Sequence, residues 1–201
     1  MQHLNQTRQK KLYQSSKLKI LGIVIARGGS KELPKKNLLK IGKLTLVERS
    51  IYASLNSKCI TRSILSTDSK EIIKKANKTK IEIPFLRPSR ISTDKSSAYH
   101  VMNHSLNWLR KQENYIPDVV VLLQSTTPFR TGHHIDSVVS ELIKSKADCV
   151  ISITNVEYPA NWMLIKNKNN KLNKLINDKD YSRRQDAPLY YKPSGMVYAY
   201  N

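Results

Sequence analysis

Short apolar runs alternate with amphipathic segments along most of the chain. The first run, residues 18–26 (LKILGIVIA), is almost continuously apolar and rich in isoleucine, which is typical of a central parallel strand covered on both faces. Similar runs follow at residues 63–67, 81–86, 118–124 and 148–154. Between the runs, apolar residues recur at helical spacing in residues 46–55, 69–77, 96–111 and 134–145. This alternation predicts right-handed βαβ units and an α/β fold, a doubly wound, mostly parallel sheet with helices on both faces.

The pattern changes after residue 156. Residues 162–176 (WMLIKNKNNKLNKLI) predict two short strands around an Asn-rich turn. Residues 177–195 are polar and predict a loop, and residues 196–200 (MVYAY) predict a returning strand. A sheet that ends on a strand with no closing helix leads us to expect that a longer fold has been cut short.

Length and composition narrow the class of protein. The 201 residues suffice for one domain, which we expect over residues 18–201, after a basic, disordered lead-in at residues 1–17. The lead-in has no apolar core and does not resemble a secretory signal, and no run approaches the roughly 20 apolar residues that span a bilayer. Two cysteines, Cys59 and Cys149, give no metal-ligand spacing and suit a reducing cytoplasm.

The net charge of +20 favours an anionic partner. A nucleic-acid surface concentrates its cations and interleaves aromatic residues, whereas the lysines here are spread along the chain and accompany asparagine, as in residues 166–175. We therefore attribute most of the positive charge to a general preference for lysine in this sequence and to solvent-exposed surfaces. A basic nucleic-acid-binding protein remains the remote alternative.

A glycine-rich loop, residues 26–37 (ARGGSKELPKKN), follows the first strand directly, where open α/β sheets bind ligands. Gly28 and Gly29 would allow successive N–H groups to converge on an anion, and four cations surround them. The loop is neither a P-loop, since Asn37 and Leu44 break that pattern, nor a dinucleotide-binding fingerprint. It could be a phosphate site or only a basic surface turn.

The surrounding blocks favour the phosphate site. LSTDS (65–69), LRPSRISTDKSS (86–97), LLQSTTPFRT (122–131) and RRQDAPLYYKPSGMVYAY (183–200) follow the loop in order. Together, these blocks resemble the acylneuraminate cytidylyltransferase family over residues 20–201. The resemblance implies a nucleotide-diphospho-sugar transferase-like fold with a small β-rich insert, residues 157–192, for dimerisation and sugar binding. It also implies a homodimer.

The resemblance further implies an enzyme that joins CTP to an acidic nine-carbon, sialic-acid-like sugar. In this family the sugar's anomeric hydroxyl attacks the α-phosphate of CTP and pyrophosphate leaves. Lys36 and Arg27 would be the catalytic residues. The nucleotide-binding residues implied are Arg27, Gly28, Gly29, Ser30, Lys31, Asn37, Arg87, Ser96 and Ser97. For the two serines, a helix N-cap is an equal alternative.

Gln124 ends the fourth predicted strand, where the resemblance implies contact with the sugar. Arg183, Arg184 and Gln185 are candidates for the sugar's carboxylate, which a guanidinium can bind bidentately, although they also fit an exposed basic loop. Arg130, after a Thr-Thr-Pro turn, can be structural.

The chain departs from the family pattern at several positions. Glu32 replaces a glycine, Lys95 replaces a threonine of many relatives, and Lys192 and Ser194 alter a sugar-recognition block. The family implies Mg²⁺, yet its Asp-x-Asp ligands would lie beyond Asn201. Asp68 is best explained as a helix N-cap, so we assign no metal ligand. A truncated, inactive paralogue that binds nucleotide without turnover is the main alternative.

Other residues are not assigned to chemistry. His100 and His104 have the spacing of a zinc pair but lack the intervening glutamate and a third ligand. Trp108 and Trp162 are interpreted as packing residues.

Overall fold

The computed structural model describes residues 18–30, 33–176 and 181–201. Chain contacts divide it into two compact units, Ser152–Ser194 and the remainder, which comprises the described residues up to Ile151 together with Gly195–Asn201. The predicted lead-in, residues 1–17, lies outside the described residues, as do Lys31 and Glu32. The smaller unit has bounds close to those of the predicted insert, whose roles in dimerisation and sugar binding stay predictions.

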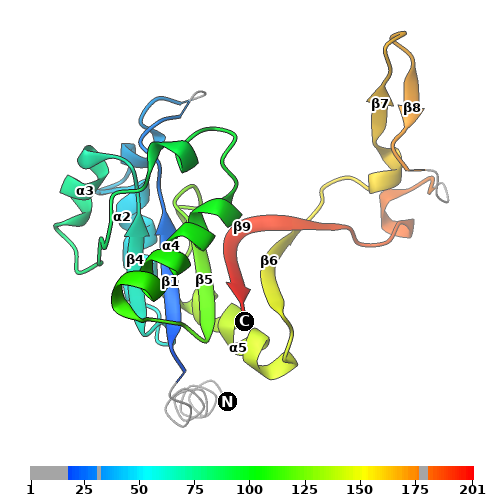
Figure 1. Cartoon of the computed structure of the whole chain (residues 1–201). Coiled ribbons are helices and arrows are strands. Elements are labelled where there is room, and N and C mark those ends of the chain that lie inside the picture. The colour runs from blue at the N-terminus through cyan, green and yellow to red at the C-terminus, as the bar shows by residue number, and fades with distance from the viewer. Residues whose placement is uncertain (1–17, 31–32, 177–180) are drawn as a thin grey trace. The chain divides into compact units, whose positions relative to one another are not determined.

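A five-stranded sheet has the strand order β4-β1-β5-β9-β6 (Figure 1). Its strands are β1 (Ile20–Ile25), β4 (Arg62–Ser66), β5 (Val119–Gln124), β6 (Cys149–Asn155) and β9 (Tyr191–Tyr200). Strand β1 runs parallel to both β4 and β5, whereas β9 runs antiparallel to β5. The predicted fold class, an α/β protein with a mostly parallel sheet, is confirmed.

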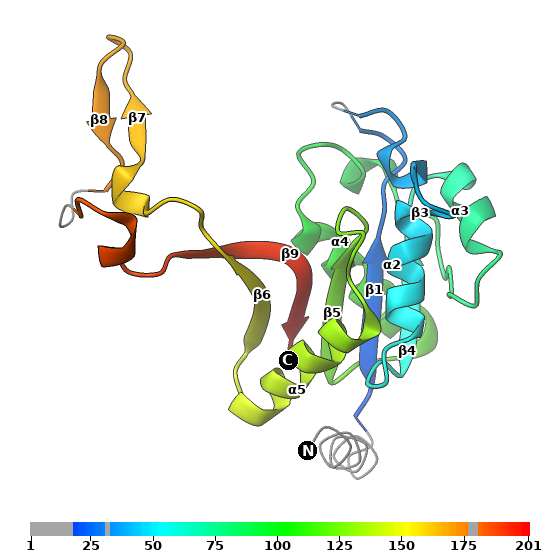
Figure 2. The same cartoon turned by 180° about the vertical axis from the view of Figure 1, so that it is seen from behind.

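Helices cover both faces of the sheet, as seen by comparing Figures 1 and 2. They are α2 (Leu46–Leu55), α3 (Lys70–Ala76), α4 (Ala98–Glu113) and α5 (Gly132–Ser145). Each begins after a hydroxyl residue whose side chain accepts a backbone N–H of the first turn, respectively Thr45, Ser69, Ser97 and Thr131. These caps satisfy N–H groups that have no partner within the helix, so the sequence fixes each helix start locally.

Side-chain alternation along the strands builds two cores. Ile20 and Val24 of β1 face the core formed with α2 and α5, while Leu21 and Ile23 face the core formed with α4. Gly22 lies on the α2 side, where an added Cβ would come within 2.7 Å of the Ser54 Oγ. Its missing side chain lets α2 pack closely on the sheet.

Two predicted boundaries are wrong. Residues 81–86 do not form a full strand, because only an isolated parallel bridge joins Glu82 to Ile64. Pro84 has no N–H to extend a ladder. Residues 191–195 are not a loop but the first half of β9, despite a proline and Gly195, whose φ is +75°. The sequence pattern also missed a small hairpin, β2 (Lys40–Ile41) and β3 (Leu44–Thr45).

The smaller unit contains the predicted hairpin. Strands β7 (Leu164–Lys166) and β8 (Leu172–Lys174) pair antiparallel. The Asn167 side-chain oxygen accepts the N–H groups of Asn169 and Lys171, which closes the Asn-rich turn. Trp162 donates its indole N–H to the Tyr181 carbonyl and is 40% exposed, so it is only partly a packing residue. Within the described part of the chain, none of the helices has the length and apolar character needed to cross a membrane.

Candidate active site

Three loops meet at the carboxyl edge of the parallel strands. Residues 26–30 follow β1, residues 67–69 follow β4, and residues 125–126 follow β5. Since parallel strands end at one edge, these loops lie together, as expected for a ligand site in an open α/β sheet. The loops after β1 and β5 line a cavity of about 280 Å³, together with residues between positions 87 and 101. The loop after β4 does not line the cavity but contacts the loop after β1 through Asp68.

Most of the residues predicted for nucleotide and sugar binding line this one cavity. They are Arg27, Gly29, Ser30, Lys36, Asn37, Arg87, Ser96 and Gln124. Gly28 and Ser97 are not among the lining residues, and Lys31 lies outside the described residues. Residues from positions 27 to 124 are thus gathered around a space suited to a small ligand.

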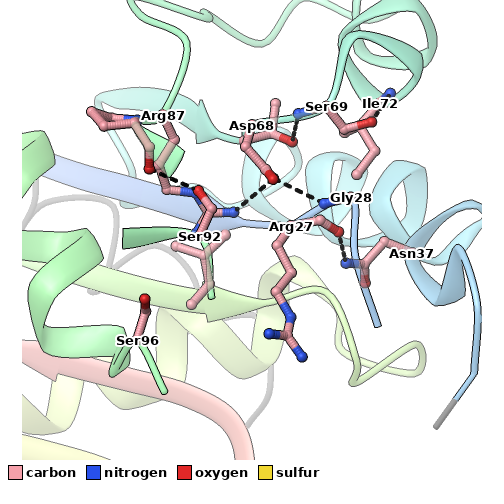
Figure 3. A network of polar contacts seen from close by, with 12 residues as sticks. Arg27, Gly28, Asn37, Asp68, Ser69, Ile72, Arg87, Ser92 and Ser96 are labelled. Carbon is pink, nitrogen blue, oxygen red and sulfur yellow. Dashed lines mark hydrogen bonds and ion pairs between the residues drawn. The ribbon is translucent and has the colours of Figure 1, made fainter. Parts of the chain in front are cut away.

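Asp68 links the glycine-rich loop to Arg87 (Figure 3). Its Oδ1 accepts the Gly28 N–H at 2.9 Å and lies 3.7 Å from the Arg87 Nη2. The predicted role of Asp68 as a helix N-cap is wrong, because Ser69 caps α3 by accepting the Ile72 N–H. The Gly28 N–H is therefore already bonded to Asp68. This bond holds the loop against the residues that follow β4 and leaves the N–H unavailable to a ligand.

Gly28 is required for close packing, not for an unusual backbone angle. Positive φ angles among the described glycines occur only at Gly42 and Gly195, so the expected backbone freedom at Gly28 and Gly29 is not used. A Cβ on Gly28 would lie 2.8 Å from the Ser69 Cβ, whereas one on Gly29 would meet nothing within 4 Å. The first glycine lets the loop approach the start of α3, and the second remains open to the cavity.

Asn37 also fixes the loop from within. It belongs to the short helix η1 (Lys36–Leu38) and is 7% exposed. Its Nδ2 donates to the Arg27 carbonyl at 2.8 Å, and its Oδ1 accepts the Ser125 hydroxyl at 2.7 Å. Asn37 thereby connects the loop after β1 to the loop after β5 and sets the position from which neighbouring Lys36 reaches the cavity.

Arg87 places a buried cation on the cavity wall. The residue is 5% exposed, and neither its Nε nor its Nη2 has a hydrogen-bond partner in the described part of the chain. Burial lowers the pKa of the guanidinium, Asp68 opposes that shift, and Arg27 adds to it. A buried, under-satisfied guanidinium beside a second cation favours an anionic ligand, which would supply the missing acceptors.

Arg27 spans from the glycine-rich loop to the cavity-lining residues between positions 87 and 101. Its Nη2 forms an ion pair with Asp94, and both side chains are about one-third exposed. An exposed pair of this kind contributes little stability and exchanges readily for a stronger ligand. The ion pair with Asp94 therefore holds Arg27 at the cavity, where its guanidinium could instead pair with a phosphate.

The two serines of residues 86–97 have different surroundings. The Ser97 side chain accepts the His100 N–H and caps α4, as the structural alternative expected. Ser96 lines the cavity, and its hydroxyl oxygen accepts the Thr93 N–H. Only Ser96 is placed to meet a ligand there.

The other predicted site residues lie elsewhere. Arg130 is 4% exposed and donates to Thr127, to the Met196 carbonyl and to Ser50, so its structural interpretation holds. Arg184 and Gln185 are exposed in the helix η4 (Arg184–Asp186) of the smaller unit, and Arg183 pairs with Asp186. Their assignment to the sugar carboxylate stays a prediction.

Sequence reasoning missed three polar residues that organise the site. They are Asp68, Asp94 and Ser125, each of which bonds or pairs with a residue of the glycine-rich loop or of η1. Asp68 and Ser125 come immediately after strands β4 and β5, so their places at strand ends were the available signal. No comparable signal marked Asp94, which lies between strands in a polar segment.

The fold and the site define an α/β protein with a cationic cavity at the carboxyl edge of its parallel strands, bordered by a glycine-rich loop. The family described as Cytidylyltransferase matches residues 21–200. The chain belongs to this cytidylyltransferase family.

Known relatives agree with this assignment. The chain is 32% identical over 182 residues to a pseudaminic acid cytidylyltransferase of Campylobacter jejuni, covering 90% of this chain and 78% of the relative. It is 30% identical over 181 residues to a CMP-N,N'-diacetyllegionaminic acid synthase of Legionella pneumophila, covering 90% and 77%. Among solved structures, a CMP:2-keto-3-deoxy-manno-octonic acid synthetase complexed with CTP shares the fold, with a TM-score of 0.65, 18% identity, and coverage of 91% and 74%.

Proposed function

We propose that this chain couples CTP to an acidic nine-carbon sugar of the sialic-acid type, giving a CMP-sugar and pyrophosphate. The anomeric oxygen of the sugar forms a bond to the α-phosphorus of CTP and loses its proton. The bond from that phosphorus to the bridging oxygen of the β-phosphate breaks, and pyrophosphate leaves. Membership of the cytidylyltransferase family supports the nucleotide, and the names of the relatives support the sugar class.

The buried guanidinium of Arg87 is the observation that carries the proposal. Arg27, Lys36 and Arg87 bring three cations to one cavity, whose only lining carboxylate among the described residues is that of Asp94. A triphosphate satisfies such a site, because it neutralises the cations and supplies acceptors for Arg87. On this proposal Arg27 leaves Asp94 for the phosphates, and Lys36 stabilises charge that develops at the α-phosphate.

Gln124 is proposed to contact the sugar. It ends β5 at the edge of the cavity, where its neutral amide can both donate to and accept from hydroxyl groups. Arg184 and Gln185 are proposed to bind the carboxylate of the sugar. Pseudaminic, legionaminic and neuraminic acids are the candidate substrates.

Mg²⁺ is proposed as the metal, held largely by the triphosphate. Among the described residues there is no group of three or more His, Cys, Asp or Glu side chains that could hold a metal ion. Asp68 is engaged by Gly28 and Arg87, and Asp94 by Arg27. We therefore assign no metal ligand among the described residues, since Mg²⁺ commonly takes most of its ligands from substrate phosphates and water.

We further propose that the chain works in the cytoplasm as a homodimer. Two free thiols, the buried Cys59 and the exposed Cys149, are compatible with a reducing compartment. Large apolar side chains are exposed throughout the smaller unit, among them Leu164, Ile165 and Leu172, which supports its use as an interface between copies.

The test is to incubate the full chain with CTP, Mg²⁺ and, in turn, sialic, legionaminic and pseudaminic acids, while measuring pyrophosphate release and CMP-sugar by mass spectrometry. We expect turnover with at least one sugar. The Lys36→Ala variant should lose on the order of 100-fold in kcat with CTP affinity changed less than about threefold, because its cation acts on the transition state.

Other outcomes would favour the alternatives. If the chain binds CTP but releases no pyrophosphate with any of the sugars, the proposed enzymatic activity is refuted and a nucleotide-binding paralogue is supported. Salt-sensitive DNA binding without CTP affinity would support the nucleic-acid alternative. Equal losses of kcat and CTP affinity in Lys36→Ala would refute its catalytic role while leaving the reaction in place.

A further inference from the structure

A second cavity, of about 630 Å³, runs along α4 and is lined by none of the residues of the glycine-rich loop. One wall is formed by Arg90 and Ile91 of the short helix η2 (Ser89–Ile91). The other is a stripe of α4, with lining residues at positions 100, 103, 104, 107, 108, 110 and 111. This i, i+3, i+4 spacing places the stripe on one face of the helix, so the cavity is a continuous groove.

The groove carries cations and no carboxylate. Its lining includes Arg90, Arg110, Lys111 and two histidines but no aspartate or glutamate. In the part of the chain that the structure describes, no ion pair engages Arg90, Arg110 or Lys111. The acidic residue of α4, Glu113, is paired with Arg62. The positive charge of the groove is thus left for a ligand to neutralise.

Two aromatic rings that line the groove, those of His104 and Trp108, pack on Phe85. Trp108 lies 5.4 Å from Phe85 between ring centroids, and His104 meets the same Phe85 edge-on at 4.8 Å. Ile91 adds an aliphatic side chain. Burial lowers the pKa of His104, and Arg90 and Arg87 lower it further. An indole beside exposed cations suits a ligand that has both a flat ring and an anionic group.

We infer that this groove is a second ligand site, for a nucleoside monophosphate whose base lies against Trp108 and whose phosphate lies among Arg90, Arg110 and Lys111. The volume is in the range of small-molecule sites. Ile91 lines both cavities, but Arg87 lines the first and Arg90 the second. The groove is therefore distinct from the active-site cavity, and the inference does not depend on the proposed reaction.

The first test counts sites by equilibrium dialysis with labelled CMP. The wild-type chain should bind one more CMP per chain than Arg90→Ala over the same concentration range, that is two against one if the active-site cavity also binds CMP. Lys111→Glu should weaken the second site by about tenfold, because a favourable charge becomes a repulsive one. The matched control is Lys144→Glu, since Lys144, like Lys111, lies in the last turn of a helix. It should leave both sites unchanged.

The second test uses the fluorescence of Trp108. In a Trp162→Phe background, Trp108 is the remaining tryptophan. CMP should quench it, and Lys111→Glu should shift this quenching to about tenfold higher CMP, whereas cytidine and inorganic phosphate should each bind much more weakly than CMP.

Four results would overturn the inference. They are a CMP count that Arg90→Ala leaves unchanged, Trp108 quenching that Lys111→Glu does not alter, equal weakening by Lys144→Glu, and binding of a single-stranded oligonucleotide in strong preference to CMP. The variants change exposed side chains, so circular dichroism and the melting temperature should match those of the wild type.

Discussion

Individual polar residues hold the glycine-rich loop in place, and Asp68 does so through two contacts. It accepts the Gly28 N–H and lies beside the buried Arg87. Asp68→Ala removes both contacts, so we expect a loss of about 1–3 kcal/mol of unfolding free energy and roughly a tenfold rise in the KM for CTP. Urea unfolding and initial-rate kinetics measure the two effects.

The isosteric Asp68→Asn variant separates the contacts. Its amide oxygen can still accept the Gly28 N–H, but it no longer carries the charge that faces Arg87. We expect a smaller change in the KM for CTP than in Asp68→Ala. If the two variants raise the KM equally, the ion pair matters to the loop and the hydrogen bond does not.

Cys59 gives a prediction about pH. Burial raises the pKa of its thiol from 9.0 to about 12, the Ser57 hydrogen bond opposes this, and Asp136 adds to it. The folded chain therefore keeps a proton that the unfolded chain loses above pH 9, so this contribution to stability is present below pH 9 and is lost as pH rises toward 12. The unfolding free energy of the wild type should fall more steeply than that of Cys59→Ala, by up to about 1.4 kcal/mol per pH unit.

Urea unfolding between pH 8 and 10.5 compares the two slopes. Thiol titration supplies an independent measurement, since the exposed Cys149 should react in the native state and Cys59 only after unfolding. Parallel pH dependences, or equal reactivity of the two thiols in the native state, would show that Cys59 is not protected as its burial implies.

The candidate site was predictable from sequence where the family resemblance marked its residues. The resemblance implied roles for Arg27, Lys36 and Arg87, and all three line one cavity. The bond from Ser125 to Asn37 was not predictable, because it joins residues 88 positions apart with common side chains. Such positioning contacts depend on how loops from different strands meet, which only the assembled sheet determines.

At the scale of elements, the loop between β1 and η1 contains two glycines with unequal requirements. Gly28→Ala would bring a Cβ to 2.8 Å from the Ser69 Cβ, so the loop or the start of α3 must shift. We expect CTP affinity to fall by about tenfold and stability by about 1–3 kcal/mol. Isothermal titration with CTP and thermal unfolding measure both.

Gly29→Ala is the matched control, because a Cβ at that position meets nothing within 4 Å and the backbone is not left-handed. It should fold with the stability of the wild type and change CTP affinity by less than about threefold. A Gly29→Ala variant as impaired as Gly28→Ala would mean that the ligand itself needs the space beside the loop, rather than α3.

Helices and buried strands were predictable because each has a local signal. The continuous apolar run of β1 and the hydroxyl caps of the four α-helices in the described part of the chain are signals that each element carries in its own sequence. Strand β9 begins earlier than predicted. The sequence pattern missed its first half because that half contains Pro193 and Gly195, which are unfavourable in strands. Pairing with neighbouring strands overrides their unfavourable propensities, and local pattern cannot report such pairing.

At the scale of the whole molecule, the exposed apolar side chains of the smaller unit are the main feature left to explain. In the β7–β8 hairpin, Leu164 and Lys174 pair directly, and so do Lys166 and Leu172. Leu164 and Leu172 therefore share one face with Lys166 and Lys174, and each leucine is more than half exposed. A patch of this kind on a small hairpin is expected to be covered by a second copy of the chain if the proposed dimer forms through this unit.

The double variant Leu164→Lys/Leu172→Lys should therefore be monomeric at concentrations where the wild type is a dimer, because it removes both leucines from this face and adds two charges beside Lys166 and Lys174. Sedimentation equilibrium measures the mass. The control is Asn169→Lys, which adds a lysine to the turn of the same hairpin without changing the strand face. A wild type that sediments as a monomer would remove the proposed dimer. A double variant that remains a dimer would place the interface elsewhere and leave the exposed hairpin face for a different partner.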